Sequence, residues 1–363
     1  MRSGCRFGFR TDRNMAKFRQ TCVSILLASS IAMLLGGHAV LAQGSRQGTT
    51  VYGAGDFLRV QQEPSSSLQG FVLDEREPLN AEASNGNEDK EEERKHIQDN
   101  SFLIEEAYNQ EPGVVQHIFN WIGLWDRDNG RSRDFLFTYI IEIPIGSQTH
   151  QFSFTPMTFE SFFEEPNGGP SEEEGGFGDM LVNYRYQLMT DDECSLRPAV
   201  APRASLILPT GDEDRGLGTG ELGYQFNLPI SKQLEPFAFH FNAGATYIPG
   251  VSVTLLNGLP SVGRDLRGYN LGTSVIWLAS YDLNFFTEFV AQWNEDLDEF
   301  GLRDKTTDVV MNPGLRYAVY TDASVQWVLG FSTPIGLSRD AADYGVFGYM
   351  SVEHAFKKVP KGR

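Results

Sequence analysis

The sequence has little cysteine and, beyond its N-terminal region, no long apolar run. Of three cysteines among 363 residues, Cys5 and Cys22 fall in a leader-like segment, so Cys194 would be the single thiol of the processed chain. An intramolecular disulfide is therefore excluded. Because no later stretch reaches about 18 consecutive apolar residues, a transmembrane helix is excluded as well.

The sequence also lacks basic stretches and the spacings of metal sites. Its formal net charge is −18, and no stripe of lysine and arginine compensates for it, which argues against nucleic acid as a partner. No two histidines after the leader have metal-ligand spacing. We therefore expect no cofactor.

The first hundred residues read as a leader followed by a polar segment. In residues 1–42, basic residues precede an apolar run at 23–35 and small residues before Gln43, which predicts a secretory signal peptide. An uncleaved inner-membrane anchor is the alternative, disfavoured because the run is short. Residues 43–100 lack periodicity and contain a charged run at 88–95, so we expect a disordered acidic segment on the periplasmic side.

Residues 101–112 have the signals of a short helix preceding the first strand. Ser101 can cap a helix, Glu105 and Glu106 favour its first turn, and Pro112 ends it. We expect this helix to cover the periplasmic mouth of the structure that follows. The alternative is a plug or gate inside a lumen.

From Gly113 onward the chain alternates between apolar and polar residues with the period of a β-strand. The clearest case is Phe237–Tyr247, where odd positions are apolar or aromatic and even positions are small or polar. Its eleven residues are close to the roughly 9–11 that cross a bilayer at a tilt. Twelve such segments are predicted, at 114–124, 134–145, 150–159, 177–189, 198–209, 219–230, 235–248, 268–280, 282–294, 307–320, 322–335 and 343–356.

The connections between these segments alternate between long and short, as in bacterial outer-membrane barrels. The pattern predicts an all-β fold, a closed antiparallel up-and-down transmembrane β-barrel over residues 113–358 with about 12 strands (range 10–14). Both termini and the short turns would face the periplasm. The apolar face of each strand would contact lipid, and the polar face would line a lumen.

Charged residues on the polar faces then belong in the lumen, because an ionised side chain toward lipid costs about 2–4 kcal/mol for Arg or Lys near the midplane. Both signs are present, so we expect pairing of opposite charges. The predicted lumen-lining selectivity residues are Glu142, Arg185, Arg203, His240, Glu288 and Arg316.

An acidic, glycine-rich stretch offers a second candidate site. Asp212, Glu213 and Asp214 present carboxylates that could bind a divalent cation in a loop, but their spacing is not that of a calcium loop, so a solvated acidic loop is the favoured interpretation. Gly216–Gly220 invites comparison with a phosphate-binding loop. No helix start or lysine accompanies it, so a hairpin loop is the favoured interpretation.

Two motifs carry a family resemblance. One is the run from Phe102 to His117, and the other is Leu208–Gly220, preceded by Gly176–Asp179. Together they resemble the outer-membrane transporter family named for the MetA pathway of phenol degradation, over about residues 102–356. The resemblance implies a Gram-negative outer-membrane β-barrel that passes small, hydrophobic or aromatic compounds, with no catalytic set to transfer.

The function predicted from these features is an outer-membrane transporter or pore, not an enzyme. Its partners would be membrane lipid, lipopolysaccharide, a small-molecule solute and the barrel-assembly machinery. One alternative is a closed barrel with a structural or surface-interaction role and no transport. An outer-membrane hydrolase is a remote alternative, because no serine motif accompanies His117 or His354, which would face outward.

Overall fold

The computed structural model describes residues 97, 101–127, 130–166, 171–192, 195–255, 261–298, 300–322 and 324–356. The predicted signal peptide, Cys194 and all of the predicted disordered segment except Ile97 lie outside the described residues. Within the described residues, no helix has the length and apolar character needed to cross a membrane.

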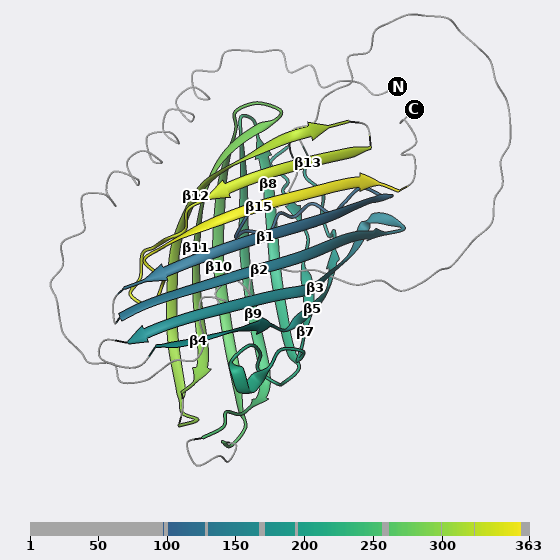
Figure 1. The fold of residues 1–363 in the computed structure, drawn as a ribbon. Helices are drawn as coiled ribbons and strands as arrows, with labels where there is room; N and C mark the ends of the chain where they lie inside the picture. Colours follow the sequence, from purple (N-terminus) through teal and green to yellow (C-terminus); the bar gives the residue numbers. More distant parts are fainter. Residues whose placement is uncertain are drawn as a thin grey trace, which may run out of the picture. The chain divides into compact units, whose positions relative to one another are not determined.

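The described chain forms one antiparallel sheet that closes on itself (Figure 1). Neighbours in sequence are neighbours in the sheet, and β15 pairs with β1 in register from Val114↔Ala355 to Trp125↔Tyr344. Three of the barrel's wall strands are interrupted, so each consists of two short strands: β4 with β5, β6 with β7, and β13 with β14. Counting each of these pairs as one strand gives the twelve strands that the sequence predicts. The strands are β1 (Val114–Asp126), β2 (Gly130–Ile145), β3 (Ser147–Pro166), β4 (Glu172–Phe177), β5 (Met180–Tyr186), β6 (Ala199–Val200), β7 (Arg203–Leu208), β8 (Gly223–Leu234), β9 (Phe237–Val251), β10 (Arg264–Leu278), β11 (Leu283–Leu297), β12 (Arg303–Thr321), β13 (Val325–Ser332), β14 (Ile335–Gly336) and β15 (Tyr344–Ala355).

The two faces of the strands divide as the alternation predicts. In β9, Phe239 and Phe241 are 37% and 39% exposed on the outside, whereas His240 and Asn242 are buried inside. An exposed aromatic surface of this extent is costly in water and favourable in lipid. Other exposed outward aromatics are Trp121, Phe135, Tyr224, Phe226, Tyr247, Tyr269, Trp277, Phe285, Trp293, Tyr317, Trp327 and Phe331.

Several strands are longer than predicted at the end opposite the termini. The β2–β3 hairpin continues through residues 130–166, into a region that the sequence suggested was loop. Cross-strand pairs hold this extension: Arg131 Nε lies 3.5 Å from Glu165 Oε2, and the Arg133 guanidinium lies 4.4 Å from the centre of the Phe163 ring. Long connections remain at 209–222 and 252–263, but the connection at 187–198 is also long and lies at the opposite, short-turn end, so the predicted sorting holds only in part.

The predicted helix at 101–112 is wrong. Residues 101–111 contain only bends and irregular backbone, and a turn at Pro112–Gly113, with Gly113 at φ +90°, leads into β1. The helix does not form because the amide groups that would bond within it bond instead to side chains of the barrel. The favoured interpretation, that this segment covers the periplasmic mouth of the barrel, is also wrong. The segment lies inside the barrel.

The inward face is not uniformly polar, which corrects a second expectation. On β3, β5 and β7–β9 it carries mainly amides, hydroxyls and charges, whereas on β1, β2, β10–β13 and β15, and at Ala238 near the start of β9, it includes a buried apolar cluster. Members of this cluster on the strands are Ile118, Ile122, Leu124, Leu136, Ile140, Ala238, Ile276, Leu278, Phe286, Val290, Val310, Ala318, Val328, Phe347 and Tyr349. The lumen therefore has a polar side and an apolar side.

Candidate functional site

The candidate site is the barrel lumen together with the segment Ser101–Gln110, called here the lumen segment. Most of its side chains are fully buried, including Leu103 at 2% exposed and Ala107 at 0%. It contacts strands from opposite sides of the closed sheet, among them β5, β9 and β11. It therefore occupies the interior rather than the rim.

Side chains of the barrel accept hydrogen bonds from most backbone amides of the lumen segment. Glu288 accepts from Leu103 N at 2.9 Å and from Ile104 N at 3.1 Å. The remaining pairs are Glu105 N to Asn242 Oδ1 (2.8 Å), Ala107 N to Ser231 Oγ (2.7 Å), Asn109 N to Gln187 Oε1 (3.0 Å) and Gln110 N to Gln151 Oε1 (2.7 Å). Buried amides need such partners, and here the polar lumen supplies them.

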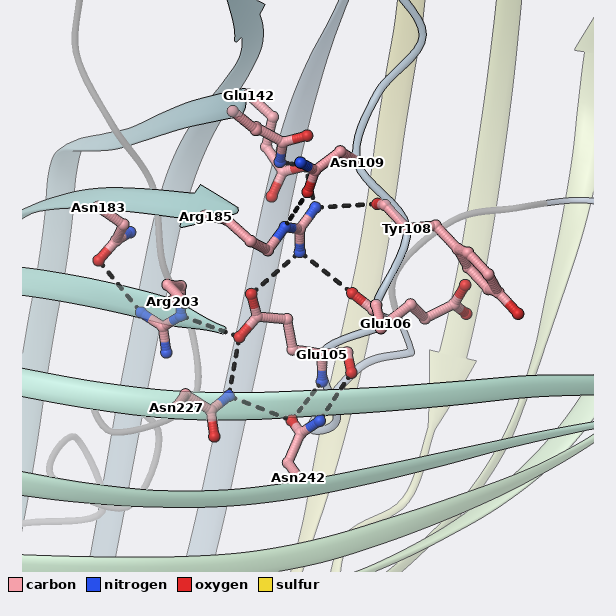
Figure 2. Close-up of polar contacts among 12 residues, drawn as sticks. Glu105, Glu106, Tyr108, Asn109, Glu142, Asn183, Arg185, Arg203, Asn227 and Asn242 are labelled. Carbon is pink, nitrogen blue, oxygen red and sulfur yellow. Dashed lines mark hydrogen bonds and ion pairs between the residues drawn. The ribbon is translucent and has the colours of Figure 1, made fainter. Parts of the chain in front are cut away.

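Glu105 is the central acidic contact of the segment (Figure 2). Its carboxylate accepts hydrogen bonds from Arg185 Nη1 at 3.0 Å and Arg203 Nε at 2.9 Å, and Asn227 Nδ2 donates to it at 2.8 Å. Both arginines are almost fully buried. Buried charges require this kind of close pairing and additional hydrogen bonds to offset their desolvation.

Arg185 ties the segment to the wall through further contacts. It donates to Asn109 Oδ1 at 2.7 Å and to the carbonyl oxygens of Glu106 and Tyr108 at 3.2 and 3.0 Å (Figure 2). It also lies 3.6 Å from Glu142. One guanidinium thus binds both the side chains and the backbone of the segment, a task that its planar fork of five donors suits.

Glu106 makes a second ionic contact on the opposite wall. Its carboxylate accepts from Arg316 Nη1 at 3.2 Å and lies 3.6 Å from His240 Nε2. His240 Nδ1 in turn lies 2.7 Å from Ser231 Oγ, the group that accepts from Ala107 N. Arg316 also donates to the Ile97 carbonyl at 3.4 Å.

The six predicted lumen residues are all at least 97% buried and come together around this segment: Glu142, Arg185, Arg203, His240, Glu288 and Arg316. Their role in selectivity stays a prediction. The amide and hydroxyl partners of the segment were not among the predicted site residues: Ser231, Asn242, Gln187, Gln151 and Asn227. Strand parity already assigned most of them to the polar face, but no pattern indicated that a chain segment lies against that face.

The glycine-rich loop is organised by Asp179, a residue outside the predicted acidic trio. Asp179, 1% exposed, accepts hydrogen bonds from Thr210 N at 3.1 Å, Gly211 N at 2.9 Å and Thr219 N at 3.4 Å, and so closes the glycine-rich loop. Asp212, Glu213 and Asp214 lie exposed around a short 3-10 turn. The described residues hold no group of three or more His, Cys, Asp or Glu side chains that could bind a metal ion, so the structure does not bring these three together as ligands.

A closed barrel with a lipid-facing aromatic surface and buried polar and charged side chains on its inner face defines the class: a β-barrel protein of the bacterial outer membrane. The family model described as "Putative MetA-pathway of phenol degradation" matches residues 113–346. The chain belongs to this family. The lumen segment lies just before the matched residues.

Comparison with solved structures gives the same fold for one outer membrane channel. The COG4313 outer membrane channel from Pseudomonas putida F1 is similar with a TM-score of 0.51 and 10% identity, covering 69% of this chain and 98% of that chain. The NanC porin has a TM-score of 0.37 and 12% identity over 65% of this chain and 98% of that chain. A mutant of the TodX monoaromatic hydrocarbon channel has a TM-score of 0.34 and 8% identity over 67% and 89%. No curated protein matches the chain.

Proposed function

We propose that the protein is an outer-membrane channel for small compounds with an apolar or aromatic part, held closed by the lumen segment. The observation that carries the proposal is the way the segment is attached. It is bound by side-chain hydrogen bonds and ion pairs, whereas the wall is a continuous ladder of backbone pairs. The segment can therefore leave without opening the wall.

The solute class follows from the two sides of the lumen. An apolar inward face is unusual for a water-filled pore, but it suits a solute that exchanges water for apolar contacts along part of its surface. The polar side would orient a hydroxyl or carboxyl group of the same solute. Membership of a family named for phenol degradation supports this class.

The remaining predictions belong to the same proposal. The barrel would sit in a bilayer whose outer leaflet is lipopolysaccharide, after insertion by the barrel-assembly machinery, and it would have no enzymatic activity. The signal peptide at 1–42 and the acidic periplasmic segment at 43–100 stay predictions. So does the periplasmic position of the short turns.

The second candidate is a closed structural or surface-interaction barrel without transport. The burial of the lumen segment favours it, because side chains fill the lumen at that level. The two candidates differ in whether the segment can be released. If the protein is a channel, removing the contacts of the lumen segment opens it. If it is a structural barrel, removing the same contacts lowers its stability and produces no conductance.

Single-channel recording in planar bilayers separates them. The double variant Glu105→Ala/Glu106→Ala removes the ionic contacts of the segment, and we expect it to conduct for at least about tenfold more of the recording time than the unmodified protein. The matched control is Glu173→Ala/Glu221→Ala, which removes two carboxylates exposed outside the lumen. If the first double variant folds but shows neither conductance nor flux of phenol into vesicles, the structural alternative replaces the channel.

A further inference from the structure

The ring of Phe102 lies in a slot lined by aromatic side chains of the apolar wall. Its centroid lies 4.6 Å from that of Phe286 on β11, edge to face, and 4.9 and 4.8 Å from those of Phe347 and Tyr349 on β15, which it stacks against. Each of the four side chains is at most 4% exposed. Aromatic pairs prefer these arrangements, so the slot recognises a flat ring rather than apolar bulk in general.

Two glycines form the floor of this slot. Gly314 on β12 pairs in register with Phe286, and Gly330 on β13 pairs with Tyr349. A Cβ atom on Gly330 would collide with the ring of Phe102, and one on Gly314 would collide with the ring of Phe286. Glycine is therefore required on two neighbouring strands at the place where a ring enters the wall.

Ser332 adds an unused polar group beside the slot. It is 1% exposed, and its hydroxyl has no hydrogen-bond partner within the part of the chain that the structure describes. It pairs in register with Gly314 on one side and Phe347 on the other. A buried hydroxyl without a partner is unfavourable, and Phe102 has no polar group to offer it. A ring with its own hydroxyl would supply what phenylalanine lacks.

We propose that this slot is a binding site for single aromatic rings that carry a hydroxyl group, with phenol as the simplest case, and that Phe102 occupies it as an internal competitor. The proposal rests on the channel function above and adds a ligand site to it. The ligand ring takes the place of Phe102 between Phe286, Phe347 and Tyr349, and its hydroxyl bonds to Ser332.

Competition links the ligand to the closed state. Two rings cannot share the slot, so ligand binding excludes Phe102 and removes the aromatic contacts that hold the lumen segment to the apolar wall. By the same reciprocity, removing Phe102 increases the apparent affinity for the ligand, because the binding-competent state no longer has to be opened first.

The test measures binding directly and does not depend on conduction. The full-length protein in detergent micelles is titrated with 4-fluorophenol, followed by fluorine NMR, and with fluorobenzene as the ring without a hydroxyl. Phe102→Ala should bind 4-fluorophenol at least about tenfold more tightly than the unmodified chain. In the Phe102→Ala background, Ser332→Ala should lower the affinity for 4-fluorophenol about fivefold, as expected for the loss of one hydrogen bond. The affinity for fluorobenzene should stay unchanged.

Matched variants assign the binding to the slot. Phe286→Ala should weaken binding of both rings about tenfold, whereas Phe285→Ala, the lipid-facing neighbour at 40% exposed, should not. If Phe286→Ala does not fold, Gly330→Ala in the Phe102→Ala background provides the same comparison by narrowing the vacated slot. Equal affinities for the unmodified, Phe102→Ala and slot variants would overturn the proposal. Slot-dependent binding without conductance would support the binding site and contradict the channel function. Conductance without slot-dependent binding would support the channel function and contradict the binding site.

Discussion

At the scale of single residues, Arg185 binds both side chains and backbone of the lumen segment. It binds the side chains of Glu105 and Asn109 and the carbonyl oxygens of Glu106 and Tyr108, and it is 2% exposed. Removing one partner of a buried ion pair leaves the other charge buried without compensation. The lumen segment should therefore depend on this residue more than on any exposed charge.

Arg185→Met keeps the length of the side chain and removes its donors. We expect the docking of the lumen segment to weaken by about 3–5 kcal/mol, because Glu105 loses a buried charged partner. Hydrogen exchange measures this directly, as loss of protection at the amides of Leu103, Ile104 and Ala107 while the strand amides stay protected. Arg197→Met, at an exposed position, is the control. Unchanged protection in Arg185→Met would show that the segment is held without its ionic contacts.

How far single residues could be predicted is visible in Glu288 and Asn242. The alternation of β11 predicted that Glu288 faces inward, because a carboxylate toward lipid is costly. The same parity places Asn242 inward on β9. The odd or even position of a residue in a strand assigns its side chain to a face of the sheet. It does not indicate which groups lie against that face. The hydrogen bonds that both residues accept from backbone amides 137–185 residues away in sequence appear only in the folded chain.

At the scale of elements, the strands were predictable and the segment before them was not. Each strand of this fold faces lipid on one side and the lumen on the other, so apolar and polar residues alternate along it with a period of two. Residues 101–112 carry good helix-capping signals, yet an isolated helix of this length is marginal. The lumen offers acceptors for its amides, and these tertiary contacts outweigh the local preference.

The glycine-rich loop at 209–220 gives a prediction at the same scale. Asp179→Ala removes the acceptor for three loop amides, which costs about 1–3 kcal/mol for each group left unsatisfied. The loop should open, and trypsin should cleave after the exposed Arg215 at least about tenfold faster than in the unmodified protein. Asp214→Ala, an exposed carboxylate in the same loop, is the control. Equal cleavage rates in the two variants would mean that Asp179 does not hold the loop.

At the scale of the whole molecule, the net charge of the chain and the net charge of the six predicted lumen residues have opposite signs. The chain carries −18, which alone would favour cations in any pore it forms. Among the six predicted lumen residues, however, three are arginines, two are glutamates and one is a buried histidine. In the closed state Glu105 and Glu106 neutralise the arginines. When the segment leaves, these six residues retain an excess of positive charge.

Which charge controls selectivity then depends on salt. At 1 M salt, where the Debye length is about 3 Å, the acids around the barrel are screened, and the arginines inside a narrow lumen are screened less. We expect the open variant Glu105→Ala/Glu106→Ala to prefer anions at 1 M KCl and to lose that preference toward 0.1 M, where the screening length reaches about 10 Å. Reversal potentials across KCl gradients measure the ratio. Adding Arg185→Gln and Arg203→Gln should abolish the anion preference at high salt, and a cation preference that persists at 1 M would show that the lumen arginines do not line the conducting path.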